Sequence, residues 1–304
     1  MPKDNNRYTL TRWQRFCSAT LYTMCRVMAV MPRFVRYYIL QEIIYFILHY
    51  IVRYRRSVVM DNLRHAFPDK SEKELSRLSR RCSLNLAEQF VNIMSIAGAS
   101  EKRLKRMMRF EGAEAYAKAT ANNDVVFLAG HHGCWEYLSI LGFYDKGHVM
   151  LSVYHPLSSC VLDDFFKRIR SVSVNELVPR DDSLLYFMRR RGKATKYSLL
   201  LIADQNPHMY YGAKWIEFFN RETIFANGGE LISRKLSLPV WLGYMRRVRR
   251  GEYEFFVEEL YDGTSPVEDN VITERYARRL EEIISESPEL WLWSHKRWKR
   301  KKMW

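Results

Sequence analysis

The sequence predicts an α/β fold with a mostly parallel central sheet flanked by helices, preceded by a membrane-associated helical segment. Two observations support this prediction. Beyond residue 60, short apolar runs alternate with amphipathic stretches, as expected where buried parallel strands are connected by helices. Before that point, apolar and aromatic residues dominate and arginines interrupt them. We therefore expect two regions, a membrane-associated helical region over residues 1–60 and an α/β domain over residues 61–304.

The individual elements follow from the period and length of each apolar run. Four runs predict strands, at 125–130, 148–156, 197–207 and 238–247. A fifth, 252–260, predicts an antiparallel edge strand. The segments with helix-like composition are 134–144, 160–170, 182–191, 228–236 and 271–285.

Two apolar stretches in the first region, 16–31 and 37–52, predict contact with a membrane. Each is shorter than the roughly 20 apolar residues that a spanning helix needs. Arginines and tyrosines border the second stretch, as in segments that lie at a bilayer surface. A slanted or in-plane anchor is the expectation, and two buried helices of the globular core are the alternative. Ser71 and Glu74 have the spacing of a capping box, which marks the start of a helix in the polar region.

The composition restricts the class of partner. Lys and Arg total 49 against 34 Asp and Glu, a formal charge of +15, which attracts anionic lipid surfaces or nucleic acid. Aromatic residues make up 14% of the chain, and such side chains favour membrane interfaces. The five cysteines include no CxxC pair, which argues against a disulfide framework or a structural zinc site and for a reduced, cytosol-facing location.

The segment 125–144 carries the residues best suited to catalysis. In an open α/β sheet, ligands bind where strands end and helices begin, and His131 follows a predicted strand. On one continuous helix, His131 and Glu136 would point in different directions, because successive residues turn by about 100°. We therefore expect His131 in a loop, with Gly130 and Gly133 allowing a tight turn and Glu136 reaching back to the imidazole. Such a pair can take a proton from a hydroxyl, which suits acyl transfer to an alcohol.

A metal site is the alternative interpretation of the same segment. His131, His132, Cys134 and Glu136 are all possible ligands. Their spacing matches none of the recurring zinc patterns. We expect neither a metal nor an organic cofactor.

Five blocks of the sequence, in order, carry a family resemblance. GHHGCWE (130–136) resembles the HFGNWE block of the bacterial lipid A biosynthesis acyltransferases, the lauroyl and myristoyl transferases of the lysophospholipid-acyltransferase-like superfamily. A histidine, four residues and an acid are the hallmark of that superfamily. The other blocks are YRRSVVMDNLRHAFPDKSEKE (54–74), ADQNP (203–207), WIEFFNRETIFANGG (215–229) and PELWLWSHKRWKRK (288–301). Together the blocks cover most of the chain, although each alone is modest.

The resemblance implies that His131 is the general base and Glu136 its orienting partner. Asp204 and Gln205 follow another predicted strand end, where they are placed to shape the acceptor or donor site. A turn cap is the alternative role for Asp204. The arginines Arg168, Arg170 and Arg180 are candidates to neutralise lipid phosphates or a developing oxyanion, with solvated surface as the alternative.

Three residues depart from the family pattern. His132 replaces the usual Phe, His155 replaces an Arg in a Y-R-P segment, and Asn220 replaces the Gly of FFG. The missing arginine affects the expected contacts to phosphate or acceptor. A protonated His155 replaces that charge in part, below its unperturbed pKa of about 6.5.

The resemblance implies a membrane-bound O-acyltransferase at the cytoplasmic face of the inner membrane. Its donor would be acyl-acyl carrier protein, and its acceptor a hydroxyl on an acyl chain of a Kdo-containing lipid A precursor. An acyltransferase for another membrane lipid, a glycerophospholipid or an aminolipid, is the near alternative. A basic nucleic-acid-binding protein is the alternative from another class, and it predicts steeply salt-dependent oligonucleotide binding that ignores His131→Ala. A non-catalytic membrane scaffold with the same fold is the third.

The end of the sequence, 291–304, interleaves tryptophans with basic residues. Trp291, Trp293 and Trp298 lie among these cations, which predicts an interfacial strip at the membrane. A solvated charged tail is the alternative for the last five residues.

Overall fold

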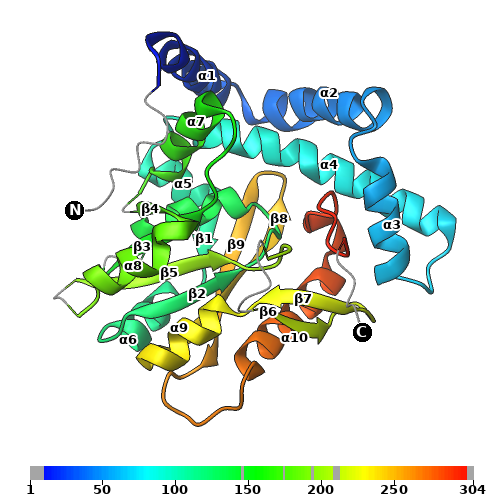
Figure 1. Ribbon diagram of the computed structural model, residues 1–304. Coiled ribbons are helices and arrows are strands. Elements are labelled where there is room, and N and C mark those ends of the chain that lie inside the picture. Colours follow the sequence, from blue (N-terminus) through cyan, green and yellow to red (C-terminus); the bar gives the residue numbers. More distant parts are fainter. Residues whose placement is uncertain (1–9, 145–146, 174, 193–194, 208–212, 300–304) are drawn as a thin grey trace.

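A sheet of seven strands forms the centre of the part of the chain that the computed structural model describes (Figure 1). That part comprises residues 10–144, 147–173, 175–192, 195–207 and 213–299. The strands, in their order across the sheet, are β1 (Met108–Phe110), β9 (Glu252–Tyr261), β8 (Val240–Arg249), β2 (Val125–Ala129), β5 (Lys196–Ile202), β3 (His148–Tyr154) and β4 (Asn175–Pro179). A separate antiparallel pair consists of β6 (Ala213–Glu217) and β7 (Glu222–Ala226).

Most of the sheet is parallel, which confirms the predicted fold class. Strands β8, β2, β5, β3 and β4 all run in one direction. Strand β9 is antiparallel to β8, and β1 is parallel to β9. The segment 252–260 is therefore antiparallel as expected, but it does not form the edge of the sheet, because β1 pairs with its outer side.

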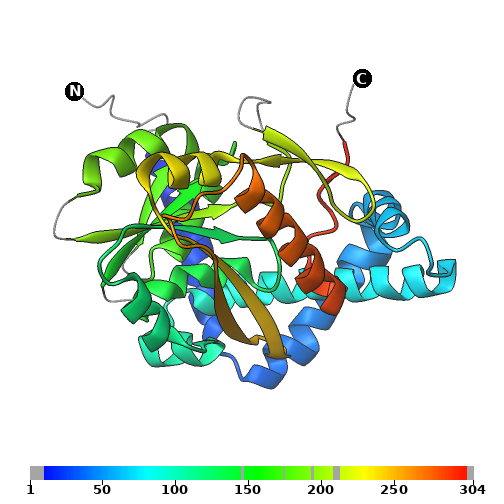
Figure 2. The same ribbon diagram turned by 90° about the horizontal axis from the view of Figure 1, so that it is seen from below.

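Helices cover both faces of the sheet. On one face lie α8 (Arg180–Arg190), α9 (Gly228–Leu236) and α10 (Val271–Glu286), whose apolar residues join one core cluster. The opposite face is covered by α5 (Glu101–Met107), α6 (Ala113–Thr120), the 3₁₀ helix η3 (Trp135–Phe143) and α7 (Cys160–Arg170), around a second cluster. The view turned by 90° shows α10 crossing the sheet beside the long β8–β9 hairpin (Figure 2).

Strand β2 shows why the central strands are continuous runs of apolar residues in the sequence. All of its residues are buried. Val126 and Leu128 belong to one core cluster, whereas Phe127 and Ala129 belong to the other. A strand covered on both faces needs apolar side chains at every position, so it lacks the alternation of a half-exposed strand.

The pairing of β2 with β5 brings two candidate site residues to one edge of the sheet. Ala129 is paired with Ile202 at the ends of these neighbouring parallel strands. His131 and Asp204 each follow their paired residue by two positions. The register therefore brings the two side chains to the same place at the carboxyl edge of the sheet.

The N-terminal region forms a helical layer beyond that edge (Figure 1). Its elements are α1 (Arg12–Val30), the π-helical η1 (Val35–Leu40), α2 (Gln41–Phe46), the π-helical η2 (Ile47–Ile51), α3 (Arg56–Ala66) and α4 (Glu72–Ile96). Both α1 and α2 pack against α4. The capping box predicted for Ser71 and Glu74 is confirmed at the start of α4. Among the described residues, no helix combines the length and the apolarity needed to cross a bilayer.

The C-terminal tryptophans lie in the core, so the predicted interfacial strip is wrong for the described residues. Trp291 and Trp293, after the short 3₁₀ helix η4 (Pro288–Leu290), are 4% and 1% exposed. Trp298 is partly buried and packs against Phe218. Their large apolar rings are stabilised more by packing against Phe218 and Phe219 than by lying at a membrane interface. Residues 300–304 of the strip lie outside the described residues.

Candidate active site

His131 is held by Asp204 at the end of the neighbouring strand. Its Nδ1 lies 2.6 Å from Asp204 Oδ1. The backbone N–H of His131 also donates to Asp204 Oδ2, at 2.7 Å. One carboxylate thus fixes both the backbone and the ring of the histidine, while 19% of the imidazole side chain remains exposed.

The hydrogen bonds around the imidazole determine which of its nitrogens carries the proton. An ionised carboxylate only accepts hydrogen bonds, so His131 Nδ1 carries the proton. The other nitrogen, Nε2, lies 3.2 Å from Nε2 of the Gln205 amide, which is a donor. His131 Nε2 is therefore unprotonated, and its lone pair accepts the hydrogen bond from Gln205.

Asp204 is suited to stabilise a charged imidazolium. It is 1% exposed and accepts a third hydrogen bond, 2.7 Å long, from Nε1 of Trp291. Burial alone raises the pKa of its carboxyl, but His131 and the donated hydrogen bonds outweigh burial and lower this pKa to about 2. The carboxylate is consequently ionised at neutral pH, and the alternative of a simple turn cap does not describe it.

Glu136 does not reach His131, so the predicted contact between them is wrong. Its two carboxylate oxygens accept hydrogen bonds from Nε and Nη2 of Arg170, at 2.8 and 2.7 Å. Gly133 has φ of +67°, and the turn it makes directs η3 toward the last turn of α7. The guanidinium fork of Arg170 occupies both oxygens of Glu136, whereas Asp204 occupies Nδ1 of His131.

The other predicted residues do not all lie in the site. Gln205 lies in the site, beside His131. Arg170 forms an ion pair with Glu136, on the segment that follows His131. Arg168 and Arg180 instead form exposed ion pairs with acids on their own helices. His155 is exposed and directly follows β3.

The C-terminal segment completes the site, and sequence reasoning missed this role. The backbone N–H of Leu292 donates to the carbonyl of His131 at 3.1 Å, and the N–H of Gly133 donates to the carbonyl of Leu290 at 3.1 Å. Trp291 supplies the indole donor to Asp204. The W-x-H-x-RWK block was the available signal, because it is one of the five blocks that carry the resemblance.

Comparison with known proteins identifies the family. The profile described as "Bacterial lipid A biosynthesis acyltransferase" matches residues 2–300. The chain belongs to the bacterial lipid A biosynthesis acyltransferase family. It is 22% identical over 250 residues to the lipid A biosynthesis palmitoleoyltransferase of Escherichia coli (strain K12), covering 81% of this chain and 79% of the relative. The lipid A biosynthesis acyltransferase of Shigella flexneri gives the same identity and coverage.

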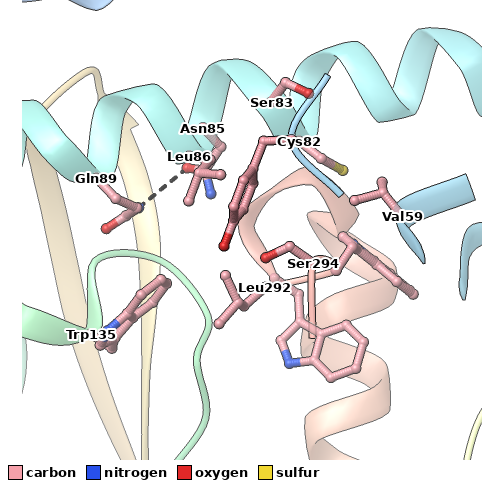
Figure 3. Close-up of a pocket in the computed structure, with 12 residues that line it drawn as sticks. Val59, Cys82, Ser83, Asn85, Leu86, Gln89, Trp135, Leu292 and Ser294 are labelled. Carbon is pink, nitrogen blue, oxygen red and sulfur yellow. Dashed lines mark hydrogen bonds between the residues drawn. The ribbon is translucent and has the colours of Figure 1, made fainter. Parts of the chain in front are cut away.

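A small cavity adjoins the site of this lipid A acyltransferase. It lies between α4 and the C-terminal segment, with Gln89, Trp135 and Leu292 on its walls (Figure 3). Trp135 contacts the His131 ring edge-on, at 5.3 Å between centroids. The volume is about 20 Å³, room for about one water molecule, so this cavity does not accommodate an acyl chain.

Two of the departures from the family pattern have clear structural consequences. Asn220 has φ of +56°, in the left-handed region that asparagine tolerates better than most residues, so it can replace glycine there. His132 is 5% exposed, and its Nδ1 has no hydrogen-bond partner. Its Nε2 donates to the carbonyl of Ser287, at 3.3 Å.

We expect His132→Phe to remove part of the acid sensitivity of the acyltransferase. Burial lowers the pKa of His132 to about 4, so the folded protein disfavours its protonation while the unfolded chain binds the proton near pH 6.5. Stability from the neutral ring is present above pH 6.5 and is lost as pH falls toward 4. Between pH 7 and 5, the variant should lose about 2 kcal/mol less free energy of unfolding than wild type. Urea unfolding at both pH values measures this, and equal losses would contradict it.

The four residues of the alternative metal interpretation are not gathered around a common point. Across the described residues, no group of three or more His, Cys, Asp and Glu side chains is placed to hold a metal ion. His132 turns toward Ser287, and Glu136 turns toward Arg170.

Proposed function

We propose that the protein transfers a fatty acyl chain from acyl-acyl carrier protein to a hydroxyl of a lipid A precursor, at the cytoplasmic face of the inner membrane. The single observation that carries this proposal is the hydrogen-bonded pair His131–Asp204, in a histidine whose side chain remains 19% exposed. A base of this kind is what an alcohol needs in order to attack a thioester.

In the proposed reaction, His131 Nε2 takes the proton of the acceptor hydroxyl as its oxygen attacks the thioester carbonyl carbon. The C–O bond of the ester forms and the C–S bond breaks, and the imidazolium returns its proton to the departing sulfur. Asp204 stabilises the imidazolium through its contact with Nδ1. The amide of Gln205 lies beside Nε2, where the hydroxyl must bind, and supplies a donor to its oxygen.

The helix formed by residues 35–51 supports association with a membrane, because its polar side chains face the rest of the protein and its apolar side chains face outward. Its inner side carries polar groups that bond to α4: Tyr37 donates to Asn92, Gln41 to the carbonyl of Leu84, and His49 contacts Ser83. Its outer side is apolar and between 41% and 64% exposed at the positions Phe34, Tyr38, Ile39, Ile43, Phe46, Ile47 and Tyr50. An apolar outer stripe of this size fits the interfacial layer of a bilayer.

The charge of the chain supports the proposed donor and acceptor. A formal charge of +15 favours both an acidic carrier protein and a phosphorylated lipid. The 22% identity to the palmitoleoyltransferase leaves both substrates as proposals.

Mass spectrometry of lipids tests the substrate. Cells that lack the protein should accumulate lipid A with one acyl chain fewer, and the wild-type gene should restore that chain while His131→Ala should not. Purified protein with acyl-acyl carrier protein should then acylate the lipid A precursor. An unchanged lipid A pattern together with altered glycerophospholipids or aminolipids would reassign the acceptor, and an active His131→Ala variant would overturn the proposed base.

A further inference from the structure

A cavity of about 290 Å³ lies between α1 and the junction of α4 with α5, apart from the residues around His131. Its walls combine two arginines and a threonine with small apolar side chains. The lining residues are Thr23, Arg26, Val27, Ala29, Val30, Ala97, Gly98 and Arg103. In Figure 1, α1 lies at the same end of the molecule as α5, across the end of α4.

The cavity has a positive charge that no described acidic side chain neutralises. No acidic side chain lines it, and among the described residues neither Arg26 nor Arg103 forms an ion pair. Nη2 of Arg103 is buried without a hydrogen-bond partner. Burial lowers the pKa of Arg103, and the nearby Arg36 cation lowers it further, yet arginine remains charged at neutral pH. One buried guanidinium nitrogen of Arg103 therefore lacks a partner, which is costly unless an anion binds to it.

The position of Arg26 is set by close packing. Gly98 has φ of +67°, and a Cβ added there would lie 2.7 Å from Nε of Arg26. The absence of a side chain at residue 98 lets the Arg26 stem lie against the backbone. The two guanidinium groups therefore face one cavity from different elements, as in sites that bind phosphate.

The same cavity opens onto an apolar surface. Val27 and Val30, which line it, are 59% and 79% exposed, and Met24 on α1 is 57% exposed. A cavity lined by both cationic and apolar side chains matches an amphiphile, whose phosphate is charged and whose acyl chains are not. A soluble anion would leave these valines in water.

We propose that this cavity binds the phosphate group of an anionic phospholipid of the bilayer, with Arg26 and Arg103 as its ligands. The inference rests on the proposed membrane association, and it adds a defined lipid site to that association. Thr23 offers a hydroxyl to the same headgroup, and Val27 and Val30 contact the start of its acyl chains.

Vesicle sedimentation tests the site with the full-length protein. Wild type should bind phosphatidylcholine vesicles and bind more tightly when they contain phosphatidylglycerol. Arg26→Gln/Arg103→Gln should keep the first affinity and lose about 30-fold of the second, from about 1 kcal/mol for each cation near the surface. Arg26→Gln alone changes an exposed side chain and should show part of the loss, which guards against a folding defect in the double variant.

The matched control is Arg12→Gln/Arg15→Gln, which removes the same charge from α1 outside the cavity. Its loss should be clearly smaller, and equal losses would show diffuse attraction and overturn the site. Inorganic phosphate and chloride are compared at equal ionic strength. Neither should abolish the preference for vesicles that contain phosphatidylglycerol; if phosphate alone abolishes it, the ligand is free phosphate. Failure of wild type to bind either vesicle would instead refute membrane association itself, whereas binding without any preference would refute only the lipid site.

Discussion

Asp204→Asn is expected to lower kcat by about 10⁴-fold with a much smaller change in KM, as the loss of the carboxylate does in other His–Asp pairs. Asp204 accepts hydrogen bonds from two groups of His131 and from Trp291. An asparagine must direct its NH₂ group either at the backbone N–H of His131 and the indole N–H of Trp291, or at the imidazole Nδ1. In the second arrangement Nδ1 accepts and Nε2 holds the proton, so the base is lost. Steady-state acyl transfer with purified protein measures both constants.

Asp124→Asn is the matched control for that experiment. Asp124 is also buried, 6% exposed, and accepts a hydrogen bond from the backbone of Tyr197 at 2.8 Å. It lies at the opposite end of the β2 and β5 pair, before the strands begin. Its substitution should reduce stability and leave kcat close to wild type. Similar losses of kcat in both variants would show that the effect of Asp204 is only structural.

Arg170→Met is expected to lower the free energy of unfolding by about 3–5 kcal/mol, because it leaves the carboxylate of Glu136 buried and unpaired. Glu136 is 5% exposed and has two hydrogen bonds to Arg170. Methionine keeps most of the length of the arginine stem, so packing against Phe166 is largely retained. Denaturant unfolding at neutral pH measures the change.

Arg168→Met, on the same helix, is the control. Its ion pair with Asp164 is largely exposed and should contribute less than about 1 kcal/mol. The double variant Glu136→Gln/Arg170→Met removes both charges and should recover part of the lost stability. Equal effects of Arg170→Met and Arg168→Met would mean that the Glu136 pair has no special energetic role.

The fold was predictable from the sequence to the extent that burial imposes a pattern. Strands β2 and β3 lie within segments predicted from their apolar runs, and β5 and β8 overlap theirs, because strands covered on both faces must be largely apolar. The position of 252–260 inside the sheet was not predictable. The strand β1 that covers it has only three residues, too few to show a period.

His131, Asp204 and Gln205 were all predicted from the sequence as site residues, but the pairing of His131 with Asp204 was not. Sequence spacing favoured Glu136, five positions away, over Asp204, 73 positions away. The choice depends on which strands are neighbours, and the β2–β5 register that decides it is a property of the folded sheet. Arg170 was predicted to neutralise a phosphate or an oxyanion for a similar reason, since nothing in the local sequence shows that α7 ends beside η3.

The tryptophans at the end of the chain were misassigned because their chemistry fits two environments. Trp291 has an apolar ring and one N–H donor, a combination that suits a membrane interface and also a core position beside a buried acceptor. Asp204 is that acceptor. Only the fold shows that the two residues meet.

The contact between Asp204 and Trp291, 87 positions apart, has a consequence for synthesis of the protein. During translation His131 and Asp204 leave the ribosome well before the indole that completes their hydrogen bonding. A nascent chain that has not reached Trp291 therefore lacks one of the three donors to this carboxylate, and we expect premature products to lack an ordered His131–Asp204 pair. We therefore expect acyl transfer only from chains whose synthesis has passed Trp291.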